Sequence, residues 1–167
     1  ISLLVFVSIG NATGNFVNIQ LPKHVSIELP RNWTVITNNQ RITLDTLVQS
    51  KRELAGASDP SSDLNFAANY YDDSGKTAAI FNIRYYPDMD VTQADSRAAS
   101  EADTEELDGA LKAEMVPAMQ QFGMTVTSWM GTKKQNINGI ISFITEYRRV
   151  SLRQGSPFRV RLVRVLN

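Results

Sequence analysis

The sequence predicts an α+β fold, an antiparallel β-sheet with helices packed on it. Short segments rich in β-branched and aromatic residues are separated by Pro, Gly and Asn, which is typical of antiparallel strands. A long stretch with helical periodicity, residues 92–122, lies between two groups of such segments. The chain has 167 residues, a length that suits one domain with a single core. We therefore expect the helices to cover the sheet.

The opening run, "ISLLVFVSIGNATG", is apolar over its first nine residues apart from Ser2 and Ser8. It is shorter than the roughly 20 residues that a membrane-spanning helix requires. Its length and the small residues that follow match the apolar region and cleavage site of a signal peptide. We expect residues 1–14 to be a signal-peptide remnant and residues 15–167 to be a single domain, with no membrane span in the mature chain. A hydrophobic first strand is the alternative.

The next segments predict edge strands and a small helix. Pro22 and Pro30 punctuate residues 16–33, and Val25, Ile27 and Leu29 alternate with polar residues, so one face of this strand should be buried. Apolar residues then recur at helical spacing from residue 42 to residue 54, which predicts a helix that ends at residue 56.

Residues 64–86 predict a β-hairpin, because two aromatic and apolar runs flank a turn that contains Asp and Gly. Within the turn, "GKT" at Gly75–Thr77 resembles the end of a phosphate-binding loop. Such a loop needs a Gly at the position that Tyr70 occupies, and it needs a helix to follow. A strand is expected there instead, so the motif is interpreted as a turn.

Residues 92–122 predict the long helix. Thr92 with Asp95 is a candidate N-terminal cap, and Gly123 is a candidate C-terminal stop. Pro117 lies inside the segment, so we expect a kink near it or a break into two helices. The expected apolar stripe consists of Leu107, Leu111, Met115, Met119 and Phe122.

The remaining residues predict a three-stranded antiparallel meander with turns at Asn138-Gly139 and Gln154-Gly155. If Gln154 and Gly155 form a two-residue turn, Arg148 lies opposite Arg161. On the same basis Val150 lies opposite Arg159. The other face should form the core, with Tyr147, Phe158, Val160 and Leu162.

Composition argues against catalysis and nucleic-acid binding. There is no cysteine, and the one histidine, His24, has no nearby partner for a metal site or a catalytic triad. The formal net charge is zero, so no long-range field would attract nucleic acid. We expect no enzyme activity, no catalytic residue, no metal and no cofactor.

Several acids and aromatic residues have a plain structural interpretation. The acids among residues 88–95 do not fit a calcium-binding loop and favour a helix start. Glu105, Glu106 and Asp108 are expected on a solvated helix face rather than as a catalytic pair. Trp33 and Trp129 are expected to pack in the core or at its rim rather than to stack on a ligand.

The distribution of charge is polarised. Residues 88–108 hold eight acids and one base, whereas six arginines and no acid follow Glu146. Like charges that face each other on a sheet are destabilising unless something neutralises them. The candidates are the acidic helix of this chain, an acidic partner or an anion. Neutralisation by the acidic helix is the first interpretation, and the alternative is a partner- or anion-binding face at Arg148, Arg159 and Arg161.

The entry "VSIELPRNW" and the meander segment "INGIISFITEYRR" resemble the PsbP-like superfamily, over residues 25–165. The group includes an extrinsic photosystem subunit, bacterial envelope proteins and secretion adaptors. The resemblance implies an α/β/α sandwich around an antiparallel sheet, and non-enzymatic binding to protein partners. It also implies a further C-terminal strand and helix, and we expect their absence here to reflect a truncated sequence. No family site maps onto these residues.

Two functions fit these observations. The first is an exported, periplasmic or secreted bacterial domain that is non-catalytic, associates with the envelope and acts through a protein partner. The alternative is a cytoplasmic adaptor or chaperone of the same fold that holds a helix of its client in an apolar groove. The first takes the opening run as a signal peptide, and the second takes it as a strand.

Overall fold

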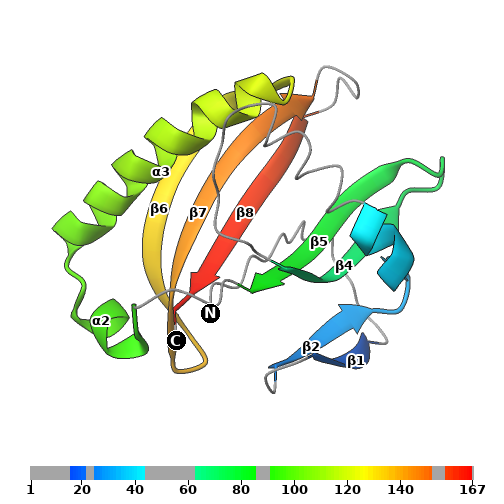
Figure 1. Cartoon of the computed structure of the whole chain (residues 1–167), viewed down its shortest axis with the longest axis horizontal. Helices are drawn as coiled ribbons and strands as arrows, with labels where there is room; N and C mark the ends of the chain where they lie inside the picture. The colour runs from blue at the N-terminus through cyan, green and yellow to red at the C-terminus, as the bar shows by residue number, and fades with distance from the viewer. Residues whose placement is uncertain (1–15, 22–24, 44–62, 86–90, 152–156, 167) are drawn as a thin grey trace. The chain divides into compact units, whose positions relative to one another are not determined.

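The computed structural model describes residues 16–21, 25–43, 63–85, 91–151 and 157–166 (Figure 1). The chain divides into two compact units, one within residues 6–86 and the other within residues 87–167. Each unit contains antiparallel strands. Helices occur together with these strands, so the fold belongs to the broad α+β class. The expected signal remnant and His24 lie outside the described residues. The single domain over residues 15–167 stays a prediction.

The first unit begins with an antiparallel pair, β1 (Phe16–Leu21) and β2 (Val25–Pro30), in which Ile19 lies opposite Ile27. Leu29 is buried and Ile27 half-buried, whereas Ser26 and Glu28 are exposed. The alternation in the sequence therefore predicted the buried face correctly.

Residues 38–43 are helical, so the helix begins four residues before the expected apolar pattern at residue 42. Thr37 caps them, since its hydroxyl accepts from the Gln40 amide at 3.4 Å and the Gln40 carboxamide accepts from the Thr37 amide at 3.0 Å. The rest of the expected helix lies outside the described residues.

The expected hairpin forms from β4 (Asp63–Tyr71) and β5 (Thr77–Tyr85), and the short β3 (Thr34–Val35) pairs with β4. Asp72 organises the turn by accepting hydrogen bonds from the amides of Ser74 at 2.9 Å and Lys76 at 3.0 Å. The core of this sheet is buried and consists of Phe66, Ala67, Ala68, Ala79, Phe81 and Ile83.

The second unit contains the predicted meander, β6 (Met124–Ile137), β7 (Ile140–Ser151) and β8 (Pro157–Val165), in that order across the sheet. Asn138 and Gly139 connect the first two strands with φ angles of 52° and 87°. Positive φ at both central positions is the tight hairpin turn that Asn-Gly favours.

Two helices precede the meander, α2 (Gln93–Ala98) and α3 (Glu101–Gln121). The predicted cap at Thr92 and Asp95 is present, and Gly123 ends α3 with a φ of 68°. The helical segment breaks at Ala99 rather than near Pro117. Ala99 has an extended backbone, and Ser100 with Asp103 forms a second capping box that starts α3.

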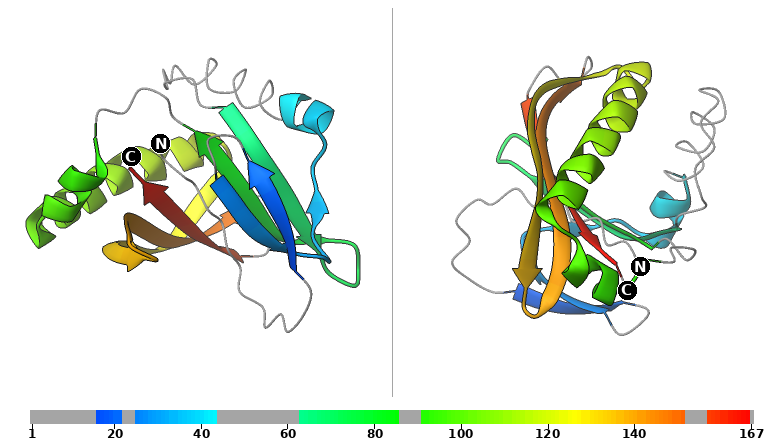
Figure 2. Two further views of the ribbon diagram at one scale, coloured as in Figure 1. Left: turned by 90° about the horizontal axis from the view of Figure 1, so that it is seen from below. Right: turned by 90° about the vertical axis from the view of Figure 1, so that its left-hand side faces the viewer.

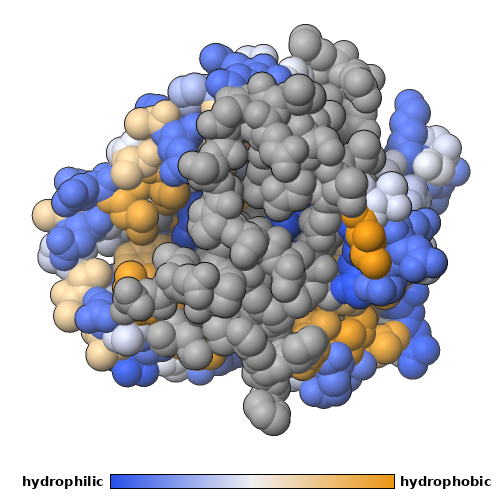
Figure 3. Space-filling model, in the orientation of Figure 1, coloured by the Kyte–Doolittle hydropathy of each residue, from blue (hydrophilic) through white to orange (hydrophobic). Residues whose placement is uncertain are grey.

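Pro117 is accommodated inside α3, close to the end of the helix. A proline inside a helix removes one backbone donor and disturbs the carbonyl four residues earlier. The expected stripe, Leu107 to Phe122, is half-buried along its length. In the space-filling view, hydrophobic and hydrophilic residues are mixed where α3 lies, at the left (Figure 3).

The helix α3 lies along β6 on one face of the sheet (Figure 2). Hydrogen bonds from side chains connect α2 to the sheet. The Gln93 carboxamide accepts from the Ile141 amide at 3.0 Å and donates to the carbonyls of Ile141 at 3.0 Å and Leu166 at 2.5 Å. Lys134 Nζ donates to the carbonyls of Arg97 and Ala99, at the C-terminal end of α2.

Candidate functional site

The predicted register of the last two strands was wrong by two residues. Arg148 lies opposite Arg159, not Arg161, and Arg161 lies opposite Glu146. Val150 pairs with Pro157 and not with Arg159. Residues 152–156, between the two strands, lie outside the described residues.

A shift of two residues leaves every side chain on its predicted face, because side chains alternate with a period of two. Tyr147, Val160 and Leu162 are buried, and Phe158 is half-buried, as expected for the core face. Arg148, Arg159 and Arg161 share the opposite face. With Glu146 they form what we call the arginine face.

Glu146 neutralises part of this positive charge. Arg159 Nη2 donates to both carboxylate oxygens of Glu146, at 3.1 Å and 3.0 Å, and Arg161 Nε lies 3.6 Å from Glu146 Oε1. The Arg159 side chain is nevertheless 60% exposed, against 28% for that of Arg161. Arg148 is exposed and forms no ion pair with a described residue.

Sequence reasoning missed Glu146, although a signal was present. It lies two residues before Arg148 on the same strand, and therefore on the same face. The acidic helix α3, one candidate source of neutralising charge, packs on the other face. One glutamate and three arginines leave the arginine face with an excess of positive charge.

The helix-covered face of the sheet holds a polar network centred on Asp108. Its Oδ1 accepts from Trp129 Nε1 at 2.9 Å and from the Thr132 hydroxyl at 2.8 Å, and Thr132 contacts the Thr145 hydroxyl at 2.9 Å. The expectation that Asp108 lies on a solvated face was therefore wrong. Glu105 and Glu106 are exposed, as predicted.

A β-bulge explains how Trp129 and Thr132 reach the same carboxylate. Positions three apart on a regular strand face opposite sides. The register of β6 shifts between Trp129 and Gly131, which brings both donors to the face that α3 covers. Gly131 has a φ of 91°, and a Cβ added there would lie 3.9 Å from Asp108 Oδ1.

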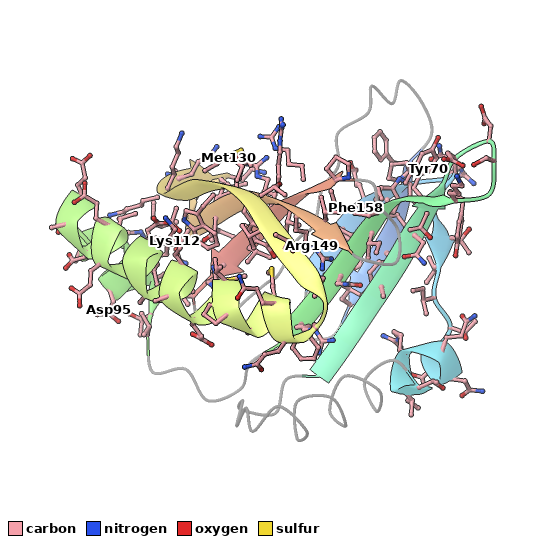
Figure 4. All side chains as sticks on the ribbon, turned by 90° about the horizontal axis from the view of Figure 1, so that it is seen from above. Tyr70, Asp95, Lys112, Met130, Arg149 and Phe158 are labelled. Atoms are coloured by element: carbon pink, nitrogen blue, oxygen red, sulfur yellow. The ribbon has the colours of Figure 1, made fainter. Side chains whose placement is uncertain are left out.

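Beside this network, Tyr147 stacks on Trp129 with ring centroids 5.5 Å apart and an interplanar angle of 11°. Burial raises the pKa of Tyr147 to about 12, although Arg149 and Arg164 act in the opposite direction. Tyr147 is thus un-ionised at neutral pH. Arg149, which contacts Met124 Sδ, lies close to the end of α3 where β6 starts (Figure 4).

The remaining sequence candidates have structural roles where they are described. Thr77 after "GK" begins a strand, as expected for a hairpin turn. Trp33 packs against Tyr70 and Phe81, with ring centroids 6.1 Å and 6.5 Å away, and is half-buried at the rim of its core. Asp95 belongs to the cap of α2, as predicted for a helix-start acid.

The described ranges contain neither a cluster of metal-binding side chains nor a helix that could cross a membrane. Among these residues no group of three or more His, Cys, Asp or Glu side chains is placed to hold a metal ion. None of the helices there is both long enough and apolar enough to cross a membrane. Comparison with protein-family models, curated proteins and solved structures found no match to the chain.

Proposed function

We propose that this chain is a non-catalytic binding domain that engages an acidic protein partner through its arginine face. The observation that carries the proposal is the position of Arg148 directly opposite Arg159 on the sheet, with both side chains exposed. Like charges in that position repel each other. Glu146 offsets one of the three positive charges, so a carboxylate from a partner would relieve the remaining repulsion.

An acidic protein fits this face better than nucleic acid does. Arginine binds carboxylates through a planar fork of donors, as Arg159 already binds Glu146. Stable binding to duplex nucleic acid commonly uses about 6–10 phosphate contacts, and salt weakens it steeply. Three arginines beside a glutamate provide too few contacts for that.

Charge reversal on the arginine face tests this proposal. A fluorescent poly-glutamate peptide serves as the probe, and anisotropy at low and high salt measures its binding. Arg148→Glu and Arg161→Glu should each weaken binding about 5- to 30-fold, since each replaces an attraction by a repulsion, while urea unfolding shows an intact fold.

Lys112→Glu is the matched control, because Lys112 is exposed on α3, away from the arginine face, and the change in net charge is the same (Figure 4). Equal effects of Arg148→Glu and Lys112→Glu would indicate a response to net charge alone and contradict the proposal. Loss of the fold in both arginine variants, with unchanged probe binding by Lys112→Glu, would assign these arginines to stability instead.

We also propose that the domain works outside the cytoplasm, in the periplasm or as a secreted protein. The support is the resemblance of residues 1–14 to a signal peptide. The intact mass of the full-length gene product from separate periplasmic and cytoplasmic fractions tests this. A periplasmic species that begins near Asn15 is expected. An uncleaved cytoplasmic species would favour the adaptor that holds a client helix.

The finer architecture that we propose is the α/β/α sandwich of PsbP-like proteins. The support is that the meander has buried residues on both faces, with Tyr147 on the face that α3 covers and Ile144 and Val163 on the other. A crystal structure should show a second helical layer over Ile144, with the arginine end of that face left open. A bare sheet face at Ile144 would contradict this architecture.

A further inference from the structure

Glu146 occupies the place that a partner's carboxylate would take on the arginine face. Both of its oxygens accept from Arg159, and one also faces Arg161. The pairing of β7 with β8 sets this arrangement, since Glu146 lies opposite Arg161 and diagonal to Arg159. One guanidinium nitrogen of Arg159 is thus already engaged by an internal acid, and Arg161 lies beside the same carboxylate.

We infer that Glu146 is an internal competitor that lowers the affinity of the arginine face for acidic protein segments. This inference rests on the proposed function and identifies the residue that sets the affinity. The ligand is an extended acidic segment of a partner protein, because its carboxylates can repeat the geometry that Glu146 shows at Arg159.

The internal pair is weak enough to be displaced. The Arg159 side chain is 60% exposed and that of Glu146 is 26% exposed, so water screens their attraction. A ligand carboxylate that reaches Arg159 must separate this pair and must also approach the negative charge of Glu146. Removal of that charge eliminates both costs and leaves Arg159 and Arg161 in place.

The same poly-glutamate probe tests the inference with Glu146→Gln, which keeps the size of the side chain. Binding should become about 3- to 10-fold tighter, as expected when a surface ion pair and one like-charge contact are removed. Glu105→Gln is the matched control, since Glu105 is exposed on α3 and the change in net charge is identical. It should leave the affinity within about 2-fold of the parent.

The outcomes separate this inference from the proposed function. If Arg148→Glu weakens probe binding but Glu146→Gln acts like Glu105→Gln, the competitor role is overturned and the binding face stands. Weaker binding by Glu146→Gln would mean that Glu146 orients the arginines, which also overturns the competitor role. If Arg148→Glu has no effect, the proposed function fails.

A folding control keeps the test decisive. The urea midpoint of Glu146→Gln is measured beside that of the parent. If this variant does not fold, Glu146→Asp takes its place, because the shorter side chain withdraws the carboxylate from Arg159 while the charge remains. Tighter binding is again expected, and unchanged or weaker binding overturns the inference.

Discussion

At the residue scale, single polar side chains join the helices to the sheet of the second unit. Gln93 completes the hydrogen bonding of Ile141 beyond the end of β8 and satisfies both backbone groups of that residue. Asp108 joins α3 to β6 by accepting from Trp129 and Thr132. A partly buried group that loses its partner is costly to leave unsatisfied, so both side chains should contribute measurably to stability.

Gln93→Ala should lower the free energy of unfolding by about 1–3 kcal/mol, because the Ile141 amide and two carbonyls lose their partner. Urea unfolding monitored by circular dichroism measures the change. Gln121→Ala, at an exposed helix position, should change it by less than about 0.5 kcal/mol. Similar values for both variants would show that the Gln93 bonds contribute nothing net.

Asp108→Ala should cost about 1–3 kcal/mol, because the Trp129 indole and the Thr132 hydroxyl lose their shared acceptor. Asp108→Asn retains a carbonyl oxygen and should cost less. The emission spectrum of Trp129 in a Trp33→Phe background reports on the indole directly. If the alanine and asparagine variants are equally stable, hydrogen bonding to this carboxylate is not what holds α3 on β6.

At the element scale, capping explains where the helices begin and why the segment divides. Thr92 with Asp95, and Ser100 with Asp103, each form a complete capping box within one stretch of sequence. The second box starts a new helix instead of extending α2, and α2 ends at Ala99, where the backbone leaves the helical conformation. The acids Asp95 and Asp103, close to the helix N-termini, therefore cap the helices and do not form a catalytic pair.

The capping acids Asp95 and Asp103 should make the free energy of unfolding depend on pH. The Thr92 hydroxyl and amide hold the pKa of Asp95 below its usual 3.8, and the Ser100 amide and hydroxyl do the same for Asp103. A pKa that is lower in the folded state contributes stability above the unfolded pKa of 3.8, and this contribution is lost as the pH falls through the folded value.

Urea midpoints between about pH 6 and pH 2.5 should therefore fall most steeply below about pH 4. Asp103→Asn should be less stable than the parent at neutral pH and should show a flatter decline on acidification. Glu105→Gln, at an exposed position later in α3, is the control. A decline of identical steepness in the parent and Asp103→Asn would contradict the role of this cap.

At the scale of the whole molecule, each compact unit has a core of its own. Phe81 and Ile83 are buried in the first unit, and Tyr147 and Leu162 are buried in the second. The two tryptophans of the chain are divided between the units, Trp33 in the first and Trp129 in the second. Each unit can therefore be followed separately during unfolding.

The prediction of a single domain over residues 15–167 requires both units to unfold together. In Trp129→Phe, fluorescence reports on Trp33, and in Trp33→Phe it reports on Trp129. Within each variant, the fluorescence and circular-dichroism transitions in urea should coincide. A fluorescence midpoint that differs from the circular-dichroism midpoint in either variant would instead indicate two independently stable domains.

Features encoded within a few neighbouring residues were predictable from the sequence. The Asn138-Gly139 turn, the hairpin around Gly75 and the cap at Thr92 each depend on the local backbone preferences of the residues that form them. The buried faces of β2, β7 and β8 followed from their alternation, since a period of two survives an error of two residues in register.

Only the tertiary structure decided which distant side chains meet. The register of β7 on β8 placed Glu146, not the acidic helix, beside Arg159 and Arg161. The bulge in β6 turned Trp129 and Thr132 toward the same carboxylate. Neither follows from local preference, because both are set by pairing and packing between segments far apart in the chain.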